Sequence, residues 1–597
     1  MTARYAIGID LGTTNSALAY CALEGDAPRV ELLNVPQLVA PATIEERALL
    51  PSFLYLGGDA DAKAKNFDLP WEKKREFAVG ELARRQAADV PTRTVAAAKS
   101  WLCHSRVDRH QPILPWNAPA DVPKVSPVAA ATRYLAHLAA AWQAAFRDAP
   151  IADQHVVLTV PASFDPAARE LTREAALAAG LPESLVLLEE PQAAVYAWLA
   201  DEGDRWRKQM KVGDRLLVCD VGGGTTDFTL VGVTEEAGNL MLTRLAVGNH
   251  ILVGGDNMDL ALAHYAAGMF TQKGVQLDPW QSVALWHSCR AAKEVLLAGE
   301  APKNKKHPIS VLGRGSKLIK GTVSVEVERE AAGSLLVEGF LPQCDLNDGP
   351  APRRASGFRE LGLPFETDTA ITRHLAAFLR AQGEQGQAAR PTHVLFNGGV
   401  FKSTLLRERL FSVMSSWFPG QPPQGMTGNE DLDYAVARGA AYYGFAKQRK
   451  AVRIRGGTAR SYYVGIETAG LAIPGAARPL RALCVVPFGM EEGTESNVPG
   501  DEIGLVVGEP AQFRFFSSAV RKDDRPGTLL NSWTDAELAE TDPLVATLPA
   551  SEEAEEGFAP VRFQSRITEL GMFELWCHSS LSDHRWKLEF SVRDEGT

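Results

Sequence analysis

Cysteine is scarce in this chain, and its placement argues against both disulfide and zinc frameworks. Seven cysteines occur among 597 residues, an odd number, and no two of them form a C-x-x-C pair. Disulfide-stabilised domains are dense in cysteine, and structural zinc sites need closely spaced ligands. The sequence therefore predicts neither kind of site.

Long apolar runs and a leader segment are missing as well. No apolar run approaches the roughly 18 residues that a membrane-spanning helix needs. The residues before Asp10 contain no hydrophobic region typical of a signal peptide. We therefore expect a cytoplasmic protein with no membrane partner.

An excess of basic residues is also absent. Lys and Arg total 62 against 73 for Asp and Glu, which gives a formal net charge of -11 at pH 7. Proteins that bind nucleic acid without sequence preference need a basic surface, so we expect no nucleic-acid partner. A chain of 597 residues is too long for one hydrophobic core, and we expect about two to four domains.

What the chain does contain is a glycine-rich pattern that occurs twice. Leu216–Leu230 reads LLVCDVGGGTTDFTL, and Tyr5–Leu18 reads YAIGIDLGTTNSAL. In each stretch two apolar runs flank a turn rich in glycine, which is the pattern of a β-hairpin. Because glycine has no Cβ, the backbone can approach a ligand, and its N–H groups with nearby threonine hydroxyls can cradle phosphate oxygens. Asp220 and Asp227, beside the second turn, are hard oxygen ligands suited to Mg²⁺.

The repetition indicates a duplicated α/β domain. One such hairpin could be an ordinary glycine turn, but two suggest that two lobes hold one nucleotide phosphate tail from both sides. Between them, His155–Val160 is a buried-type strand, and a helix is expected over Pro166–Ala179. Leu185–Leu188 is a second short strand, which leads into the acidic pair Glu189–Glu190. Polar residues at strand ends are typical of a site at the edge of an α/β sheet.

Other segments of the first half carry weaker signals. Leu49–Leu56 predicts one strand, Gly57–Glu76 an exposed polar excursion, and Thr92–Cys103 a helix that holds Lys99. Ser126-Pro127 predicts the start of a long helix that ends near Arg147, with serine as N-cap and proline at the first position.

The second half of the expected α/β domain ends near residue 446. Gly254–Asp259 and Gln281–Leu297 predict helices, and Val323–Gly357 is expected to be irregular. The strand His393–Phe396 ends at Asn397-Gly398-Gly399, where glycine leaves room for a flat ring or a sugar. Asp433–Phe445 predicts a closing helix rich in small residues.

A basic segment then separates an all-β region. Lys447–Arg460 reads KQRKAVRIRGGTAR, and we place the domain boundary there. Beyond it, Arg585–Val592 alternates strictly, and shorter strands are expected at Ile503–Val507, Gln512–Phe516, Arg562–Glu569 and Phe573–Cys577, with a turn at Leu570-Gly571 and an acidic loop at Ser551–Glu556. The prediction is an α/β domain over 1–446, a linker over 447–460, and an antiparallel β-sandwich over 461–597.

These motifs resemble those of actin-like (ribonuclease-H-like) two-lobe nucleotide-binding proteins, and further segments narrow the resemblance to the 70-kDa heat-shock (DnaK-type) chaperones. The matching segments are VPASFD at Val160–Asp165, EEPQAA at Glu189–Ala194, GGDNMD at Gly254–Asp259, DYAVARGAA from Asp433, VGIET at Val464–Thr468 and FRFFSSAVRKDDRPGTL at Phe513–Leu529. The likeness is highly specific over the first 445 residues and looser afterwards.

The resemblance implies roles for residues at matching positions. Asp10 and Asp220 would hold hydrated Mg²⁺, and Lys99 would neutralise charge that grows on the transferred phosphoryl group. Glu190 and Asp227 would orient the waters of Mg²⁺ and the attacking water, with Thr225 beside the phosphates. The nucleotide would be held by Gly12, Thr13, Thr14, Asn15, Gly222, Gly223, Gly224, Thr225, Gly255, Lys293, Gly398, Gly399, Lys402 and Asp433. Pro161 and Arg169 would relay the state of the nucleotide to the substrate domain.

The chain departs from that family's pattern in several places. In the nucleoside pocket, the usual acid, base and serine are replaced by Arg290, Glu294 and Leu297, an arginine by Lys402, and an aromatic residue by Met258. The segment Lys447–Arg460 contains no leucine run of the kind with which the family's linker docks. No helical segment follows the last strand, where the family has a lid over bound peptide. These departures predict an altered nucleoside pocket, altered communication between domains, and fast release of peptide.

The function that the resemblance implies is that of a divergent chaperone. It would use ATP/ADP and Mg²⁺, hydrolyse ATP slowly, and bind unfolded or exposed apolar peptide through its C-terminal β domain, with a co-chaperone as a further partner. An alternative is a nucleotide-gated scaffold or regulator with one dedicated partner and negligible turnover. A small-molecule kinase is a third reading, because sugar kinases share the fold, but Lys99, the Glu190 segment and the β-rich C-terminus count against it.

Overall fold

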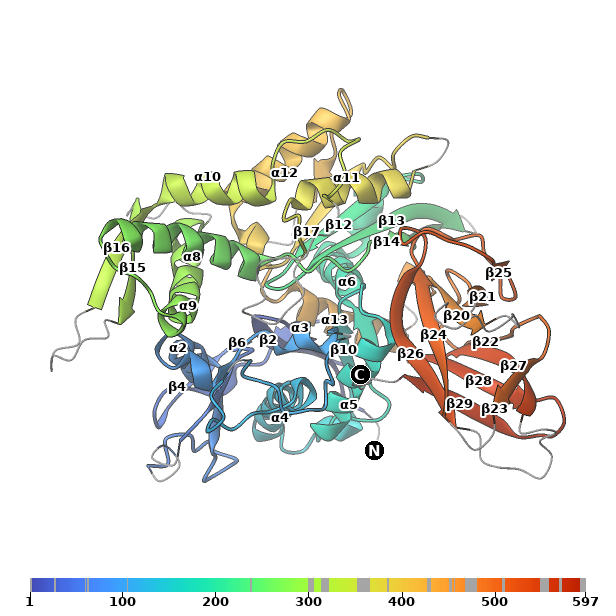
Figure 1. The fold of residues 1–597 in the computed structure, drawn as a ribbon, viewed down its shortest axis with the longest axis horizontal. Helices are drawn as coiled ribbons and strands as arrows, with labels where there is room; N and C mark the ends of the chain where they lie inside the picture. Colours follow the sequence, from blue (N-terminus) through green and yellow to red (C-terminus); the bar gives the residue numbers. More distant parts are fainter. Residues whose placement is uncertain are drawn as a thin grey trace, which may run out of the picture.

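The computed structural model of the chain places three parts side by side. The residues that it describes are 3–25, 28–58, 61, 64–104, 106–116, 118–236, 239–298, 305–312, 322–351, 366–383, 386–426, 431–449, 454–455, 457–467, 480–506, 510–547, 558–568 and 572–590. Figure 1 shows two lobes, each built on one glycine-rich hairpin, and an all-β part beside them, coloured orange to red.

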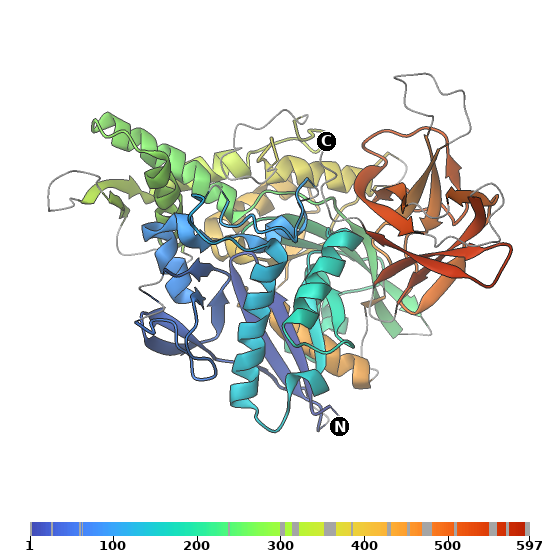
Figure 2. The ribbon, with the colours of Figure 1, turned by 60° about the horizontal axis from the view of Figure 1, so that its bottom comes forward.

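Lobe one is built on a mixed sheet whose centre is the first hairpin. Strands β1 (Tyr5–Leu11) and β2 (Asn15–Ala22) pair antiparallel, and β1 pairs in parallel with β10 (His155–Val160). The sheet continues through β11 (Val186–Glu189), β3 (Val30–Leu32) and β6 (Leu49–Pro51). Figure 2 shows helices α4 (Pro127–Ala145) and α5 (Pro166–Ala178) lying across one face of these strands.

Both of these helices begin at an N-cap residue, and Ser126 is the cap that the sequence predicts. The Ser126 hydroxyl accepts a hydrogen bond from Ala129 N (3.0 Å), and an Asp165 carboxylate oxygen accepts one from Ala168 N (2.8 Å). A proline follows each cap, where its missing N–H costs no intrahelical bond. The two predicted helices are therefore confirmed within one or two residues.

Lobe two repeats the arrangement of lobe one. Strand β12 (Arg215–Val221) pairs antiparallel with β13 (Thr226–Glu236) and in parallel with β17 (His393–Asn397). Three further strands complete the sheet: β14 (Asn239–Val247), β18 (Gln424–Gly425) and β19 (Ile454–Arg455). Strands β12, β13 and β17 thus correspond to β1, β2 and β10, and both predicted hairpins are confirmed.

Two helices cross between the lobes. Helix α6 (Glu190–Glu202) follows the last strand of lobe one but packs on β12, β13 and β17 of lobe two. Helix α13 (Ala435–Arg449) comes at the end of lobe two but packs on β1, β2 and β10 of lobe one. The two helices meet at Gly439, where a Cβ would lie only 1.7 Å from the Ala193 carbonyl oxygen. Glycine is therefore required there, and the crossing brings the two sheets together.

Smaller elements surround each sheet. In lobe one they are β4 (Val35–Ala40), β5 (Thr43–Arg47), β7 (Leu54–Leu56), β8 (Phe77–Val79), β9 (Thr94–Val95), α2 (Glu81–Asp89) and α3 (Ala98–Leu102). In lobe two they are α7 (Trp206–Gln209), α8 (Gly255–Gln272), α9 (Pro279–Leu296), β15 (Lys306–Leu312), β16 (Thr322–Glu328), α10 (Arg329–Phe340), α11 (Ile371–Ala381) and α12 (Thr404–Trp417). Helices α8, α9 and α10 enclose a common apolar cluster with the β15–β16 hairpin.

Two predictions for lobe one are wrong because of pairings between distant strands. The single strand expected over Leu49–Leu56 divides into β6 and β7, which join different sheets. Ser52 lies at the break, where its N–H donates to Thr14 O (2.9 Å). The helix expected over Thr92–Cys103 is reduced to α3, because residues 94–95 form β9 and pair with β7.

Two segments that were expected to be irregular or exposed are regular or partly buried instead. Val323–Gly357 contains most of β16 and all of α10, and the alternation of Val325 and Val327 toward the core was a strand signal that sequence reasoning overlooked. In Gly57–Glu76, Phe67 and Leu69 are buried, so this excursion is partly a core element. Residues 352–357, at the end of the segment expected to be irregular, lie outside the described residues.

The C-terminal part consists of antiparallel strands. Its strands are β20 (Ser461–Glu467), β21 (Leu480–Val486), β22 (Thr494–Asn497), β23 (Ile503–Val506), β24 (Pro510–Ser518), β25 (Leu529–Leu530), β26 (Ala539–Thr547), β27 (Phe558–Ile567), β28 (Phe573–Ser579) and β29 (Arg585–Phe590). They pair in the order β22-β27-β28-β29-β26-β24-β20-β21-β25, with β23 beside β27. Side chains from both ends of this series, such as Val464 and Phe563, share one apolar core.

The predicted strands of this part are confirmed where the structure describes them. The last residues predicted for three of them (507, 569 and 591–592), the turn at Leu570-Gly571 and the acidic loop at Ser551–Glu556 lie outside the described residues. The segment assigned to the linker begins inside α13, which ends at Arg449. Farther along the same segment, β19 pairs in parallel with β14 of lobe two. The division of the chain into domains stays a prediction. Within the described ranges, no helix is both long and apolar enough to cross a membrane.

Candidate functional site

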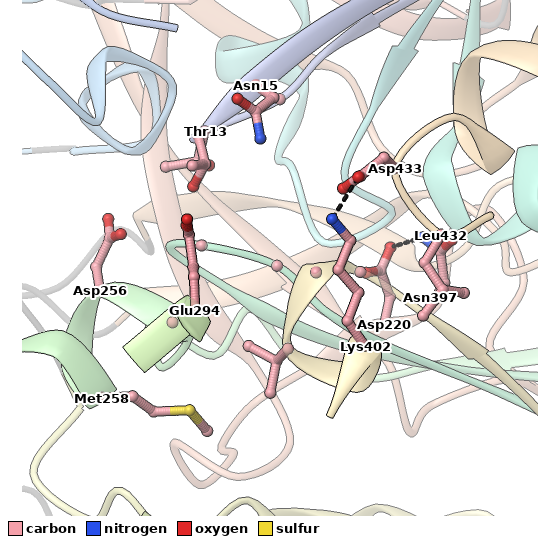
Figure 3. A pocket seen from close by; sticks show the side chains of 18 of the residues that line it. Thr13, Asn15, Asp220, Asp256, Met258, Glu294, Asn397, Lys402, Leu432 and Asp433 are labelled. Atoms are coloured by element: carbon pink, nitrogen blue, oxygen red, sulfur yellow. Dashed lines mark hydrogen bonds and ion pairs between the residues drawn. The ribbon is translucent and has the colours of Figure 1, made fainter. Parts of the chain in front are cut away.

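A cavity of about 480 Å³ lies between the two lobes. Figure 3 shows side chains that line it, with Thr13 and Asn15 of lobe one on one side and Asp220 and Asn397 of lobe two on another. Most of the residues singled out in the sequence line this cavity: Asp10, Gly12, Thr13, Thr14, Asn15, Lys99, Glu190, Asp220, Gly222, Gly223, Thr225, Gly255, Lys293, Gly398, Gly399, Lys402 and Asp433. Gly224, Asp227, Pro161 and Arg169 are not among its lining residues.

The two hairpin turns lie directly against each other. A Cβ on Gly223 of lobe two would be 2.1 Å from the Thr14 hydroxyl of lobe one. A Cβ on Gly224 would be 2.5 Å from the hydroxyl of Ser100, the neighbour of Lys99. No side chain fits at these two positions, so the backbone of one lobe comes close to hydroxyls of the other. Such a concave set of donors suits the oxygens of a phosphate chain.

Asp10 and Asp220 occupy equivalent places in the two lobes. Each lies near the end of the first hairpin strand, and each is held by a residue on the neighbouring parallel strand. Thr159 Oγ1 donates to Asp10 Oδ1 (3.2 Å), and Asn397 Nδ2 donates to Asp220 Oδ2 (2.8 Å). These two supporting residues are also the strand partners of the aspartates in the sheet register. The symmetry places one carboxylate from each lobe at the cavity, and of the two Asp220 is buried and Asp10 is half-buried.

Lys99 and Glu190 form a buried ion pair at the same cavity. Lys99 lies on the short helix α3, and its Nζ contacts Oε1 of Glu190, the first residue of α6. Burial lowers the pKa of Lys99, but the carboxylates of Glu190 and Asp10 more than offset this, and the pKa is raised overall. Lys99 therefore carries a positive charge inside the site.

This end of the cavity contains more carboxylates than Lys99 can neutralise. Burial, together with the charge of Glu190, raises the pKa of Asp10 to about 7, although Lys99 and Thr159 oppose the shift. Burial and Glu190 raise the pKa of Asp220 well above its ordinary value. Burial also raises the pKa values of Glu190 and Asp227. Such raised values indicate unsatisfied negative charge that a bound cation would relieve.

The donor set fits a hydrated divalent cation better than a metal held by protein alone. Among the described residues, no three His, Cys, Asp or Glu side chains converge closely enough to hold a metal ion by themselves. Magnesium usually keeps several waters and takes only one or two carboxylates with phosphate oxygens. Asp10 and Asp220 fit that role. When bound, Mg²⁺ would neutralise charge on the phosphate oxygens.

The far end of the cavity differs in character because its cations are already paired. Arg290 on α9 bonds Asp256 Oδ1 (2.6 Å) and Asp259 Oδ2 (2.9 Å), both on α8. Lys293 donates to Gly255 O (2.7 Å) and lies 2.6 Å from Asp259 Oδ1. The sequence predicts the motif GGDNMD at Gly254–Asp259 as part of the site but assigns no role to its two acidic residues, Asp256 and Asp259. The structure shows that they neutralise the two cations of α9.

A second ion pair lies across the cavity from α9. In Figure 3, Lys402 at the end of the 3-10 helix η5 (Gly399–Lys402) reaches Asp433, just before α13. Glu294 lines the cavity opposite this pair, while Met258 and Leu297 are buried there. The end expected to hold a nucleoside therefore has an apolar wall, one exposed carboxylate and one salt bridge.

Arg169 lies behind the cavity, facing the C-terminal part. Its Nη2 donates to Glu189 Oε1 (2.9 Å), and Arg244 on β14 contacts the other oxygen of the same carboxylate. Arg244 also donates to Gly457 O, just before the C-terminal strands. These charges line a small cavity of about 60 Å³ that Tyr462 and other C-terminal residues complete. The position suits a relay between the parts, and the relay role of Arg169 and Pro161 stays a prediction.

Comparisons with known proteins agree with this geometry. Residues 69–330 match the family model described as "Hsp70 protein". The chain is 32% identical over 274 residues to the chaperone protein HscA of Xenorhabdus nematophila, covering 44% of this chain and 37% of that protein. It is 30% identical over 332 residues to the chaperone protein HscA homolog of Bordetella pertussis, covering 54% of this chain and 45% of that protein. The chain thus spans less than half the length of these curated relatives.

Proposed function

We propose that this chain is a divergent member of the Hsp70 family that binds Mg-ATP, hydrolyses it slowly and couples hydrolysis to the binding of unfolded peptide. Family membership implies ATP hydrolysis and chaperone activity at the level of the family. The observation that carries the proposal for this chain is the cavity between two equivalent hairpins, with a buried lysine and four carboxylates beside it.

The roles proposed for these residues suit phosphoryl transfer, where positioning and charge stabilisation provide most of the catalysis. Thr13, Thr14 and the turn Gly222–Thr225 would bind the phosphates from both lobes. Lys99 would stabilise charge on the transferred group, and its contact with Glu190 holds it in place. Glu190 and Asp227 would orient the attacking water, because carboxylates accept hydrogen bonds from it.

The first experiment is single-turnover hydrolysis of Mg-ATP by the purified full chain, beside a Lys99→Ala variant. We expect slow hydrolysis that falls about a hundredfold or more in the variant, since Lys99 stabilises charge in a buried site. Lys306→Ala is a matched control, because Lys306 pairs with Glu328 on the exposed β15–β16 hairpin, away from the cavity. Equal rates for the wild type and Lys99→Ala would refute the ATPase assignment.

Peptide binding is assigned to the C-terminal β part. Its strands share the antiparallel arrangement expected of the family's substrate domain, and it contacts lobe one through Arg109 and Asp542 and lobe two through Lys522 and Leu245 O. We expect ATP to change the affinity for a fluorescent unfolded peptide about tenfold or more. An affinity that is the same with ATP, with ADP and without nucleotide would contradict coupling.

One observation favours the scaffold alternative, with one dedicated partner and negligible turnover. Arg290 and Lys293 are fully engaged by Asp256 and Asp259, so the cations of α9 are not free to grip a base or sugar. A partner that is retained by the Lys99→Ala variant, together with nucleotide binding but no hydrolysis in the wild type, would support this alternative. Cytoplasmic location, a co-chaperone partner and the absence of nucleic-acid and membrane partners remain proposals.

A further inference from the structure

Asn397 holds the Asp220 carboxylate from the neighbouring strand, and both residues line the cavity between the lobes. Its Nδ2 donates to Asp220 Oδ2 at 2.8 Å, a contact drawn as a dashed line in Figure 3. Asn397 and Asp220 are only 2% and 6% exposed. Because an ionised carboxylate can only accept hydrogen bonds, the amide nitrogen of Asn397 must face Asp220 and its amide oxygen must point elsewhere.

The other oxygen of Asp220 is confined by the backbone of the next residue along β17. Gly398 has a φ of +85°, and a Cβ there would lie 2.7 Å from Asp220 Oδ1 and 2.3 Å from Val221 O. Both the positive φ and the close approach require glycine at this position. The Asp220 carboxylate is thus fixed at one oxygen by a hydrogen bond and at the other by close packing.

The equivalent contact in lobe one is weaker. Thr159 has a single hydroxyl proton, and two acceptors lie within its reach, Asp10 Oδ1 (3.2 Å) and Ile9 O (3.4 Å). Asn397 has two amide protons and makes the shorter bond. Asp220 is therefore held more firmly than Asp10, although the strands that carry the two aspartates pair in the same way.

The amide oxygen of Asn397 has no partner in the described part of the chain. Asn397 Oδ1 is buried, and none of the described residues donates a hydrogen bond to it. An unpaired buried acceptor is costly, and a ligand or a water usually satisfies it. Since Asn397 lines the cavity beside Asp220, the waters that Mg²⁺ retains would provide such donors.

We propose that Asn397 is a positioning residue of the cation site. Its N–H fixes the Asp220 carboxylate, and its carbonyl oxygen accepts a hydrogen bond from a water bound to the cation. Side chains that orient metal ligands typically contribute about 10- to 100-fold to metal affinity. The firmer hold on Asp220 further implies that lobe two provides most of the protein's affinity for the cation. This inference rests on the proposed binding of Mg-ATP between the lobes.

The test measures how much a cation strengthens nucleotide binding, with no hydrolysis involved. ADP is titrated calorimetrically into the full chain in EDTA and again in saturating Mn²⁺, which prefers the same oxygen ligands as Mg²⁺. The ratio of the two Kd values is the gain due to the cation. Asn397→Leu keeps the shape of the side chain without its polar atoms, and it should lower this gain about tenfold or more. A residue with a merely structural role would change both Kd values alike and leave the gain as it is.

Two further variants separate the parts of the proposal. Asn397→Thr keeps a donor toward Asp220 but removes the carbonyl oxygen, so it should retain only part of the gain. Thr159→Val should lower the gain less than Asn397→Leu does, because Asp10 is held less firmly. Asn66→Leu is the matched control, because Asn66 Nδ2 also donates to an aspartate, Asp61 Oδ1 (3.1 Å), but lies away from the cavity. It should retain the full gain.

The outcomes distinguish this inference from the proposed function. A wild type that binds ADP neither in EDTA nor in Mn²⁺ would defeat the proposed function itself. If the wild type binds ADP but gains nothing from Mn²⁺, or if Asn397→Leu shows the same gain as the wild type, the inference is overturned. A loss in Thr159→Val as large as that in Asn397→Leu would also overturn it. Should Asn397→Leu fail to fold, a full gain in Asn397→Thr would have the same meaning.

Discussion

Arg109 and Asp542 form a buried ion pair between lobe one and the C-terminal strands, with Nη1 3.0 Å from Oδ2. Their side chains are only 1% and 4% exposed. Arg109 lies in the loop that follows α3, and Asp542 lies on β26. On the other side, Lys522 donates to Leu245 O (2.8 Å) of lobe two. The C-terminal part is therefore fastened to both lobes by charged side chains.

Breaking the buried pair should be costly. Arg109→Ala leaves the Asp542 carboxylate without its partner, and we expect a loss of about 3–5 kcal/mol in the free energy of unfolding of the docked state. Arg514→Ala is the control, because Arg514 pairs with Glu540 on the surface, where side chains are 54% and 49% exposed. That change should cost about 1 kcal/mol or less. Urea unfolding of the full chain measures both, and equal losses would contradict a special role for the Arg109 pair.

The same pair should make stability depend on pH. Burial and the nearby Asp165 raise the pKa of Asp542 to about 6, against the opposing effect of Arg109. Because the folded-state pKa lies above the unfolded value of about 4, the folded state binds the proton more tightly. This contribution to stability is full below about pH 4 and is lost as the pH rises through 6. The unfolding free energy of the wild type should therefore fall relative to that of Asp542→Asn as the pH rises from 4.5 to 7, and a constant difference would refute the assignment.

The contact between the hairpin turns should tolerate no side chain. Gly223→Ala would place a Cβ 2.1 Å from Thr14 Oγ1, so the two turns must move apart, and we expect loss of nucleotide binding. Gly268→Ala is the matched control, because a Cβ there meets nothing within 4 Å on the exterior of α8. It should raise stability by up to about 1 kcal/mol, since alanine favours a helix more than glycine does. Calorimetric titration with Mg-ATP distinguishes the two, and normal binding by Gly223→Ala would contradict the expectation.

The salt bridge at the nucleoside end should affect binding more than stability. Lys402 and Asp433 are 50% and 20% exposed, so Lys402→Ala should change the unfolding free energy by less than about 1 kcal/mol. Lys402 lines the cavity, however, and we expect ATP affinity to fall several-fold. The single-turnover rate of bound ATP should stay the same, because Lys99 provides the charge at the phosphates. A slower hydrolysis rate with unchanged ATP affinity would indicate that Lys402 acts at the phosphates, and it would contradict a role at the nucleoside end.

Local patterns in the sequence were sufficient to predict the parts on which the site is built. The hairpins, the helices that begin at Ser126 and Asp165, and the strand His155–Val160 follow from periodicity, glycine turns and capping residues within a few positions. The structure confirms these elements. It also brings most of the residues singled out in the sequence to one cavity, although their roles remain predictions.

Tertiary structure decided what depends on residues far apart in the chain. Thr94–Val95 is a strand rather than part of a helix because β7 supplies its hydrogen bonds, which outweigh local helix propensity. Arg290 bonds to Asp256 and Asp259, and Arg109 to Asp542, because folding buries these charges where only a partner can compensate for lost water. No local pattern identifies such partners. The sequence by itself determined which residues could meet a phosphate; the packing of the lobes determined which charges remained free to do so.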